Sequence, residues 1–285
     1  MNSNPATLRG ALWMGGAVLS FAAMAVAVRE LQRHMGPFEI LFLRSVVMLL
    51  IVAAMVPRAG TVALRTQRLG THVSRNLLHF AGQYCWVYAI GALTLATVFA
   101  IEFTMPVWVA LLAAVFLGER LRAHRLVQLA CGLAGVLIIL RPGAGAFHPA
   151  ALVMILGSFC FAGTMIFTKR LSATDTPLDV LFWMSVVQTP IALAAALPRW
   201  VAPMAADLPW IAAIGIGSYT AHYCMTRSMQ LVDATVAVPI DFIRLPLIAV
   251  IGAVYYDEAF DPLVFAGAAV IFAGTYYSLY RESRR

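Results

Sequence analysis

Residues 11–31 read ALWMGGAVLSFAAMAVAVREL, and residues 151–171 read ALVMILGSFCFAGTMIFTKRL, a near copy that lies 140 residues later. The same offset aligns GPFEILFLRSVV at 36–47 with TPLDVLFWMSVV at 176–187. The identical pairs are Ala11/Ala151, Leu12/Leu152, Met14/Met154, Phe21/Phe161, Ala22/Ala162, Leu31/Leu171, Pro37/Pro177, Leu41/Leu181, Phe42/Phe182, Ser45/Ser185, Val46/Val186 and Val47/Val187. A repeat of this length in a chain of 285 residues indicates two copies of one structural unit.

Both copies are rich in apolar residues, which make up 62% of the chain, whereas charged residues make up only 12%. A typical soluble domain carries about 25% charged residues. The apolar residues form runs of roughly 18–22 residues, the length that an α-helix needs to cross a bilayer core. We therefore predict an all-α membrane protein with ten transmembrane helices, near 9–29, 38–56, 75–93, 95–117, 125–141, 149–168, 179–197, 209–230, 233–256 and 262–280.

Positive charges are distributed unequally between the two faces that this topology defines. Of the 20 lysine and arginine residues, three lie within spans (Arg44, Arg227 and Arg244) and four on the outer face (Arg29, Arg33, Arg141 and Arg199), so the other 13 share a face with both termini. The positive-inside rule therefore places both termini in the cytoplasm.

Each copy holds five spans, so the second copy enters the membrane from the side opposite to the first. We place the two units at residues 1–145 and 146–285, within one membrane domain. Inverted repeats of this kind are typical of secondary transporters, in which the substrate site lies near the membrane midplane between the halves.

Two acidic residues lie deep inside spans, where a charge costs about 2.5–3.5 kcal/mol on insertion scales. They are Glu102 and Asp241, which occupy equivalent positions of the two copies. Pro106 follows Glu102, and Pro239 and Pro246 flank Asp241. Because proline removes a helix hydrogen bond and bends the span, we expect hinges at these three prolines.

The role of the charges within spans stays open at this point. Arg244, three residues after Asp241, either pairs with it on one helix face or binds a substrate carboxylate while Asp241 or Glu102 binds an ammonium group. Glu102 has no charged neighbour at helical spacing, so it is expected to bind an amine, carry a proton or stay protonated. For Arg44, one interpretation is that its long side chain extends to the outer headgroups.

The third span carries polar and aromatic residues on one helix face, namely Asn76, His79, Gln83 and Trp86. The eighth span repeats the stripe with Ser218, His222 and Met225. Polar groups facing lipid would be costly, so both stripes are predicted to point inward, either to a cavity or to other helices.

The whole chain resembles the drug/metabolite transporter superfamily, in its ten-span, EamA-type branch. The residues that carry the resemblance are PFEILFLRSVVMLL at 37–50, LGERL at 117–121, its echo YDEAF at 256–260, and GAAVIFAG at 267–274; Met184 departs from the pattern where the second copy would have arginine. Within the branch, the chain is most similar to bacterial exporters of aromatic and other amino acids. The resemblance implies a central cavity lined by spans one, three, four, six, eight and nine.

These observations together predict a secondary transporter that exports small amphipathic metabolites, amino acids and aromatic ones among them, by alternating access. The predicted substrate-binding residues, including four that the resemblance adds from spans one and six, are His79, Gln83, Trp86, Glu102, Phe103, His222, Asp241, Arg244, Phe21, Met24, Phe161 and Thr164. The predicted hinges are Pro106, Pro239 and Pro246.

The sequence has no GxSxG, HExxH or Walker-type motif, so no enzymatic activity, cofactor or metal is expected. The expected partners are a small-molecule substrate and the lipid bilayer, and no nucleic acid is expected. We expect the protein to lie in a bacterial inner membrane as a monomer or weak oligomer. Two alternatives remain open. One is a proton-coupled drug or cation exporter that uses Glu102, and the other is a channel or a non-transporting membrane protein that binds partners.

Overall fold

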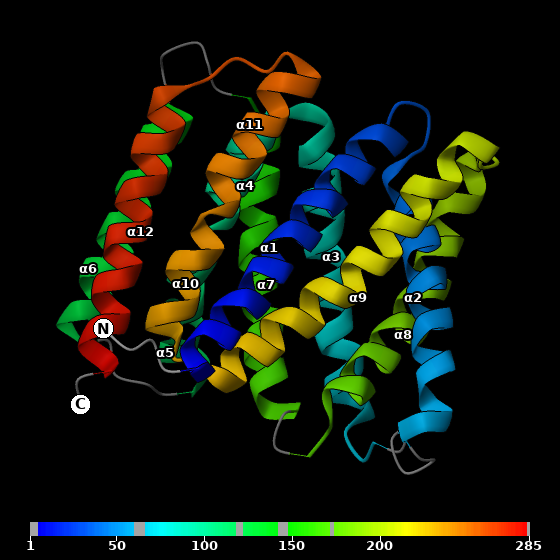
Figure 1. The fold of residues 1–285 in the computed structure, drawn as a ribbon, viewed down its shortest axis with the longest axis horizontal. Coiled ribbons are helices and arrows are strands. Elements are labelled where there is room, and N and C mark those ends of the chain that lie inside the picture. Colours follow the sequence, from blue (N-terminus) through cyan, green and yellow to red (C-terminus); the bar gives the residue numbers. More distant parts are fainter. Residues whose placement is uncertain (1–4, 60–65, 118–121, 142–147, 172–173, 284–285) are drawn as a thin grey trace.

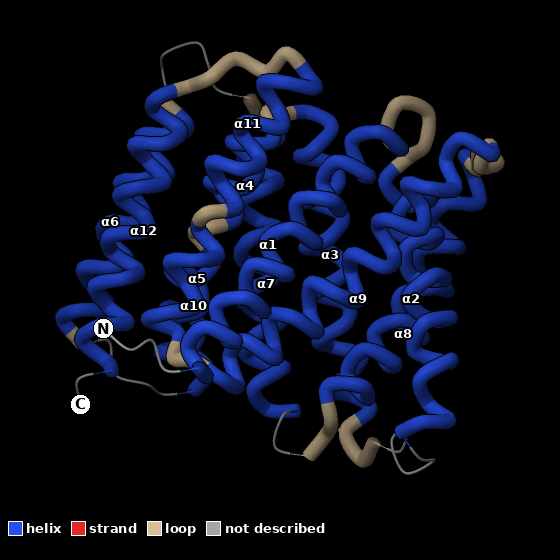
Figure 2. The backbone as a smooth tube through the Cα atoms, viewed as in Figure 1, coloured by secondary structure: helices blue, strands red, loops and turns tan. Residues whose placement is uncertain are grey.

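The computed structural model describes residues 5–59, 66–117, 122–141, 148–171 and 174–283, and within these ranges the regular structure is entirely helical (Figures 1 and 2). Two short 3-10 turns, η2 (Leu197–Arg199) and η3 (Ala205–Asp207), precede the ninth helix. The α-helices are α1 (Pro5–Leu31), α2 (Pro37–Ala59), α3 (Leu69–Ala92), α4 (Leu95–Glu102), α5 (Met105–Leu117), α6 (Ala123–Leu140), α7 (Ala150–Leu171), α8 (Pro177–Ala196), α9 (Leu208–Leu231), α10 (Ala234–Phe242), α11 (Arg244–Tyr256) and α12 (Pro262–Ser283).

Eight stretches of the described chain are long and apolar enough to cross a membrane: 8–31, 37–55, 95–116, 123–140, 150–171, 178–199, 235–256 and 262–283. The remaining long helices, α3 and α9, have 24 residues each. At about 1.5 Å per residue each is long enough to span a bilayer, but both carry the polar stripes that lower their hydropathy. Composition therefore supports eight of the ten predicted spans.

Two of the apolar stretches are each built from two helices, and proline explains where they break. The nitrogen of Pro106 has no hydrogen to donate to the carbonyl of Glu102, and α4 ends at Glu102. In the same way Pro246 cannot bond the carbonyl of Phe242, and α10 ends at Phe242. Pro239 instead lies inside α10.

The two halves of the chain interlock by exchanging equivalent partners. Helix α1 packs along α9, and α7, its copy, packs along α3, the copy of α9. Helix α2 pairs with its own copy α8, and α6 with its own copy α12, at opposite edges of the bundle (Figure 1). The two copies therefore form one helical domain rather than two separate bundles.

Glycine allows a close approach between α6 and α12. A Cβ atom added to Gly135 would lie 2.6 Å from the carbonyl oxygen of Gly267, and one added to Gly267 would lie 2.6 Å from the carbonyl oxygen of Gly135. Small residues at a helix contact let two backbones approach closely in this way.

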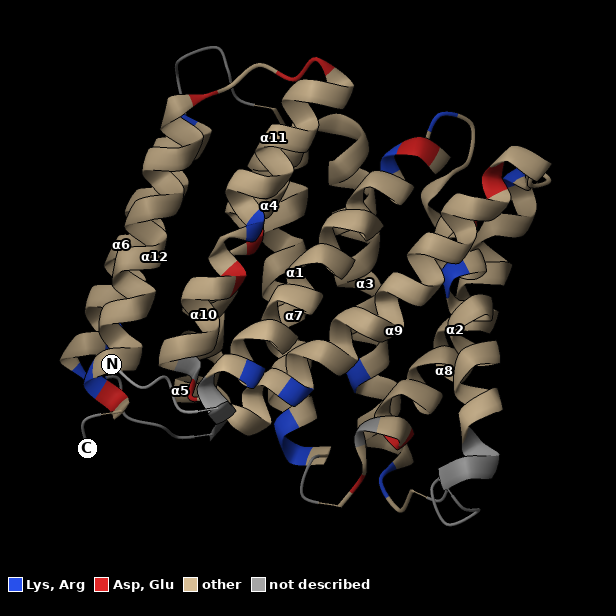
Figure 3. Ribbon diagram, viewed as in Figure 1, with Lys and Arg blue, Asp and Glu red and all other residues tan. Residues whose placement is uncertain are grey.

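Most charged residues lie toward the two ends of the helices (Figure 3). Helix α1 begins and α12 ends at the same end of the bundle (Figure 1). The middle of the bundle is mostly apolar, with a core that includes Ile90, Phe99 and Ile101. One clear exception lies at mid-height, where Figure 3 shows acidic and basic residues beside the break between α10 and α11.

Candidate functional site

The breaks of the two interrupted spans meet in the interior of the protein. Phe103 follows α4 and Phe242 ends α10, and their rings stack with centroids 4.0 Å apart and planes 15° apart. The two residues are 139 positions apart, the local offset of the repeat, so equivalent points of the two copies touch each other. The stacked pair thus marks the junction between the copies.

Arg244 lies at this junction between two carboxylates. Its Nη2 atom is 3.2 Å from Oε1 of Glu102 and 3.4 Å from Oδ2 of Asp241. Arg244 opens α11 and Glu102 closes α4, which are the helix ends where the backbone dipole disfavours each charge. Their stabilisation therefore comes from each other. The indole nitrogen of Trp86 also donates to Oε2 of Glu102 at 2.7 Å.

Aromatic rings surround the guanidinium of Arg244 on several sides. Its carbon lies 4.6 Å from the ring centroid of Phe21, 4.9 Å from that of Phe99 and 5.1 Å from that of Phe103. Arg244 is 3% exposed, and its Nε and Nη1 atoms have no hydrogen-bond partner in the described part of the chain. With two carboxylates and one guanidinium, this cluster carries a net charge of −1 when all three groups are ionised.

Arg44 occupies a second buried site, and its position corrects the interpretation that it extends to the headgroups. The side chain points into the protein, where it is 3% exposed. Nη2 donates to Oε1 of Gln83 at 2.8 Å and to Oε1 of Gln188 at 3.0 Å, and Nη1 donates to Oγ of Ser218 at 3.1 Å. These acceptors come from α3, α8 and α9, so Arg44 of α2 binds four helices together.

The polar network continues from Arg44 along α3. Gln188 Nε2 lies 3.1 Å from Nδ1 of His79 and 3.3 Å from the carbonyl oxygen of Asn76. Arg75 donates to the side chain of Asn76 at 2.7 Å, and its Nε donates to Thr168 at 3.1 Å. The polar stripe of α3 therefore points inward, and these contacts join it to α7 and α8.

A row of rings connects the Arg44 network with the Arg244 cluster. The rings of His79 and His222 have centroids 5.9 Å apart, and Phe21 lies 6.1 Å from His222 on one side and beneath Arg244 on the other. Phe161 stands 5.7 Å from His79. Residues of both copies thus form a continuous row of ring contacts between the two clusters.

Two other predicted residues, Met24 and Thr164, make different kinds of contact. Met24 receives a contact from Ser218, with 3.8 Å between Oγ and Sδ. Thr164 is buried, and its hydroxyl bonds the carbonyl of Cys160 in its own helix at 2.9 Å. A cavity of about 280 Å³ lies elsewhere, lined by residues 229–233 and 236 at the end of α9.

Local spacing missed several side chains of these clusters, namely Arg44, Arg75, Thr168, Gln188, Phe99 and Phe242. It also treated Glu102 as lacking a charged neighbour, because Arg244 is 142 positions away in the sequence. A signal was present for Gln188, which is a polar residue within an otherwise apolar run.

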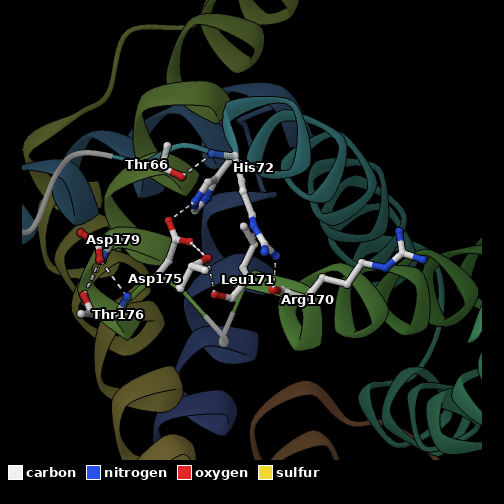
Figure 4. A network of polar contacts seen from close by, with 9 residues as sticks. Thr66, His72, Arg170, Leu171, Asp175, Thr176 and Asp179 are labelled. Carbon is white, nitrogen blue, oxygen red and sulfur yellow. Dashed lines mark hydrogen bonds and ion pairs between the residues drawn. The ribbon is translucent and has the colours of Figure 1, made fainter.

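Among the described residues, a histidine–aspartate pair joins the two copies at each end of the bundle. At one end, His72 Nε2 of α3 lies 2.9 Å from Oδ1 of Asp175, which follows α7 (Figure 4). At the other, His34 Nε2, which follows α1, lies 3.0 Å from Oδ2 of Asp207 at the start of α9. The two pairs connect equivalent places with the roles of histidine and aspartate exchanged.

Hydrogen bonds control the ionisation of both aspartates. Desolvation raises the pKa of Asp175, but hydrogen bonds from His72, Thr174 and Thr66 outweigh it, so the pKa lies below its usual value. Desolvation likewise raises the pKa of Asp207. A hydrogen bond from the backbone N–H of Met204, a hydrogen bond from His34 and the charge of His34 outweigh it, so the pKa of Asp207 also lies below its usual value.

The sequence pattern of the EamA-like transporter family matches this chain twice, over residues 8–141 and 148–280. A solved crystal structure that covers 96% of this chain and 98% of its own superposes on it with a TM-score of 0.68, at 19% sequence identity. That likeness concerns the fold alone.

Three curated bacterial relatives align over most of their own length. A riboflavin transporter of Brucella anthropi is 32% identical over 95% of this chain and 98% of its own. An S-adenosylmethionine uptake transporter of Rickettsia bellii is 26% identical over 95% and 94%, respectively. A pseudopaline exporter of Pseudomonas aeruginosa is 28% identical over 90% of each chain. All three names describe the movement of a metabolite, and two of them state a direction, uptake in one and export in the other.

Proposed function

This chain belongs to the EamA-like transporter family, and on that premise we propose that it is a secondary carrier that exports small amphipathic metabolites, amino acids and aromatic ones among them. In this proposal, ten helices cross the membrane as two inverted units, residues 1–145 and 146–285, with both termini in the cytoplasm. The bias of positive charge supports the orientation. The bacterial relatives support a bacterial inner membrane.

The observation that carries the proposal is the meeting of two interrupted spans around Arg244, Glu102 and Asp241. Ionised groups inside a membrane are costly, and in membrane proteins they mark substrate or ion pathways. Helix breaks at membrane depth are tolerated where they lie within protein or line a pathway. Hinges beside Pro106 and Pro246 let α4 and α5, and likewise α10 and α11, change their relative angle during alternating access.

The side chains along the row of rings, between the Arg44 network and the Arg244 cluster, support an amphipathic substrate. Phe21, Phe103 and Phe161 offer apolar surface, and His79, His222 and Gln83 offer polar contacts beside it. Such a mixture suits a compound with a charged part and an apolar part. The names of the relatives cover a vitamin, a sulfonium metabolite and pseudopaline, which supports small-molecule transport more broadly than amino acids.

Counterflow in proteoliposomes tests the proposal. Vesicles with the purified protein are loaded with one unlabelled compound at a time, first L-phenylalanine, and the same labelled compound is added outside without an ion gradient. A carrier gives saturable, transient accumulation of label. Accumulation that does not saturate indicates a channel, and no accumulation across a panel that includes riboflavin and S-adenosylmethionine contradicts the carrier proposal.

A matched pair of histidine variants tests the location of the path. His79→Ala removes a ring that lies 5.9 Å from His222 in the interior, whereas His148→Ala removes an exposed histidine before α7. We expect lower counterflow for the first variant and wild-type counterflow for the second. Equal counterflow in both variants would place the substrate path elsewhere.

Proton coupling through Glu102 is a second candidate, favoured by one specific observation. Glu102 and Asp241 share a single guanidinium, so one negative charge of the cluster stays without a cation. A proton on one carboxylate would neutralise the cluster. Proton-coupled export predicts flux driven by a pH gradient in the wild type and loss of that drive, but not of counterflow, in Glu102→Gln. A gradient response equal to wild type in Glu102→Gln would exclude this role.

A further inference from the structure

Arg44 is a buried cation whose acceptors are all neutral. Its three hydrogen bonds end on two amide oxygens and one hydroxyl oxygen, and its Nε atom has no partner in the described ranges. Arg244 differs, because it touches two carboxylates. The two interior arginines therefore have opposite electrostatic surroundings.

Arg75 extends the same excess of positive charge. It is 5% exposed, and it donates to Asn76 and Thr168, both neutral. Gln188 connects the two arginines, because it accepts from Arg44 and donates to the carbonyl of Asn76. Within the described residues, no carboxylate pairs with either guanidinium, so the network carries a charge of about +2, since arginine stays protonated in proteins.

An uncompensated charge in a low-dielectric interior is costly, and arginine does not escape that cost by releasing its proton. A carboxylate acceptor adds the attraction of opposite charges to the hydrogen bonds, which a neutral amide or hydroxyl oxygen does not. An anionic group that reached Arg44 would thus replace weaker partners with a stronger one. The planar fork of the guanidinium fits a carboxylate with two parallel hydrogen bonds.

We propose that Arg44, supported by Gln83 and Gln188, binds a carboxylate group of the transported compound. This inference rests on the proposed carrier function and refines it. It reassigns the anion-binding role that the sequence suggested for Arg244, whose guanidinium is already neutralised by Glu102 and Asp241.

Binding to the purified full-length protein in detergent tests the site directly. Three probes share one phenyl ring: L-phenylalanine, 3-phenylpropanoate without the amine, and phenethylammonium without the carboxylate. Ligand-dependent thermal stabilisation gives an apparent affinity for each. We expect Arg44→Gln to bind both carboxylates at least about tenfold more weakly, as expected for losing a charged hydrogen bond, and to bind phenethylammonium as the wild type does.

Two further variants make the outcome decisive. Arg227→Gln removes an exposed arginine of α9 that bonds Gln230, and it should bind all three probes as the wild type does. Arg44→Lys keeps the charge without the planar fork, so it should show a smaller loss for the carboxylates, and it serves where Arg44→Gln does not fold. Equal affinity of wild type, Arg44→Gln and Arg44→Lys for 3-phenylpropanoate overturns the proposal, and so does absence of carboxylate binding by the wild type.

Counterflow separates this inference from the carrier proposal. If the wild type binds 3-phenylpropanoate through Arg44 but shows no counterflow of any compound, the carrier proposal fails and the carboxylate site stands. If L-phenylalanine counterflow has the same KM in wild type and Arg44→Gln, the carboxylate site fails and the carrier proposal stands.

Discussion

Replacing Arg244 by methionine is expected to destabilise the protein strongly, whereas replacing either of its acidic partners by an amide is expected to be mild. Arg244 is 3% exposed and is the cation for both Glu102, at 3.2 Å, and Asp241, at 3.4 Å. Methionine fills similar space but leaves both carboxylates in the interior without a positive charge. Breaking a buried ion pair by removing one partner costs about 3–5 kcal/mol.

The exposure of the two carboxylates places the cost of Arg244→Met at the low end of this range, and their shared cation explains why the amide substitutions cost less. The side chains of Glu102 and Asp241 are 16% and 26% exposed, so water screens part of the loss, and about 3 kcal/mol is expected for Arg244→Met. Glu102→Gln leaves Arg244 paired with Asp241, and the new amide oxygen can still accept from Trp86. The substitution removes only the negative charge from the bonds that residue 102 makes to Arg244 and Trp86, which costs about 1 kcal/mol.

The apparent melting temperature of the purified protein in detergent, followed by tryptophan fluorescence, measures the order of stability. We expect Glu102→Gln and Asp241→Asn close to wild type and Arg244→Met well below them. The triple variant with all three changes should recover most of the loss, because it leaves no unpaired charge. The reasoning is refuted if Arg244→Met melts with the wild type, or if the triple variant is no more stable than Arg244→Met alone.

Three further predictions concern helix packing, pH and capping. Gly267→Ala should cost about 1–3 kcal/mol, because its Cβ would lie 2.6 Å from a backbone oxygen of α6. The control Gly15→Ala places a Cβ with no atom within 4 Å, so it should not destabilise the protein. Equal melting temperatures of the two variants would contradict the α6–α12 contact. Asp175 should stabilise the protein at pH values above the usual carboxyl pKa of about 3.9, and this stabilisation should fade as the pH falls through the lower pKa that Asp175 has in the folded protein. The difference in melting temperature between wild type and Asp175→Asn measures it. A difference that grows on acidification would contradict the prediction. Thr176→Ala should cost about 1 kcal/mol, because Thr176 and Asp179 form a capping box at the start of α8, and the same melting assay checks it against wild type.

Several features of this fold were predictable because they depend on short stretches of sequence. The apolar runs and the 140-residue offset predicted membrane-spanning helices in two copies. The polar spacing of residues 76–86 predicted that this face of α3 points inward, since helical geometry places such residues together wherever the helix lies.

The long-range pairs, in contrast, were decided by how the two copies pack. Arg244 meets Glu102 only because α11 lies against α4, and Arg44 meets Gln188 only because α2 pairs with α8. Helical spacing describes neighbours three or four residues apart, and it says nothing about a residue on a different helix.

The sequence by itself determined that this protein consists of two similar apolar units with charges and prolines inside two equivalent spans. Only the tertiary structure decided which charges neutralise one another. It gave Arg244 two carboxylates and left Arg44 with neutral acceptors, although both are single arginines within apolar segments. The physical reason is that electrostatic interaction depends on separation in space, and in a bundle of antiparallel helices that separation is set by packing between side chains far apart in the chain.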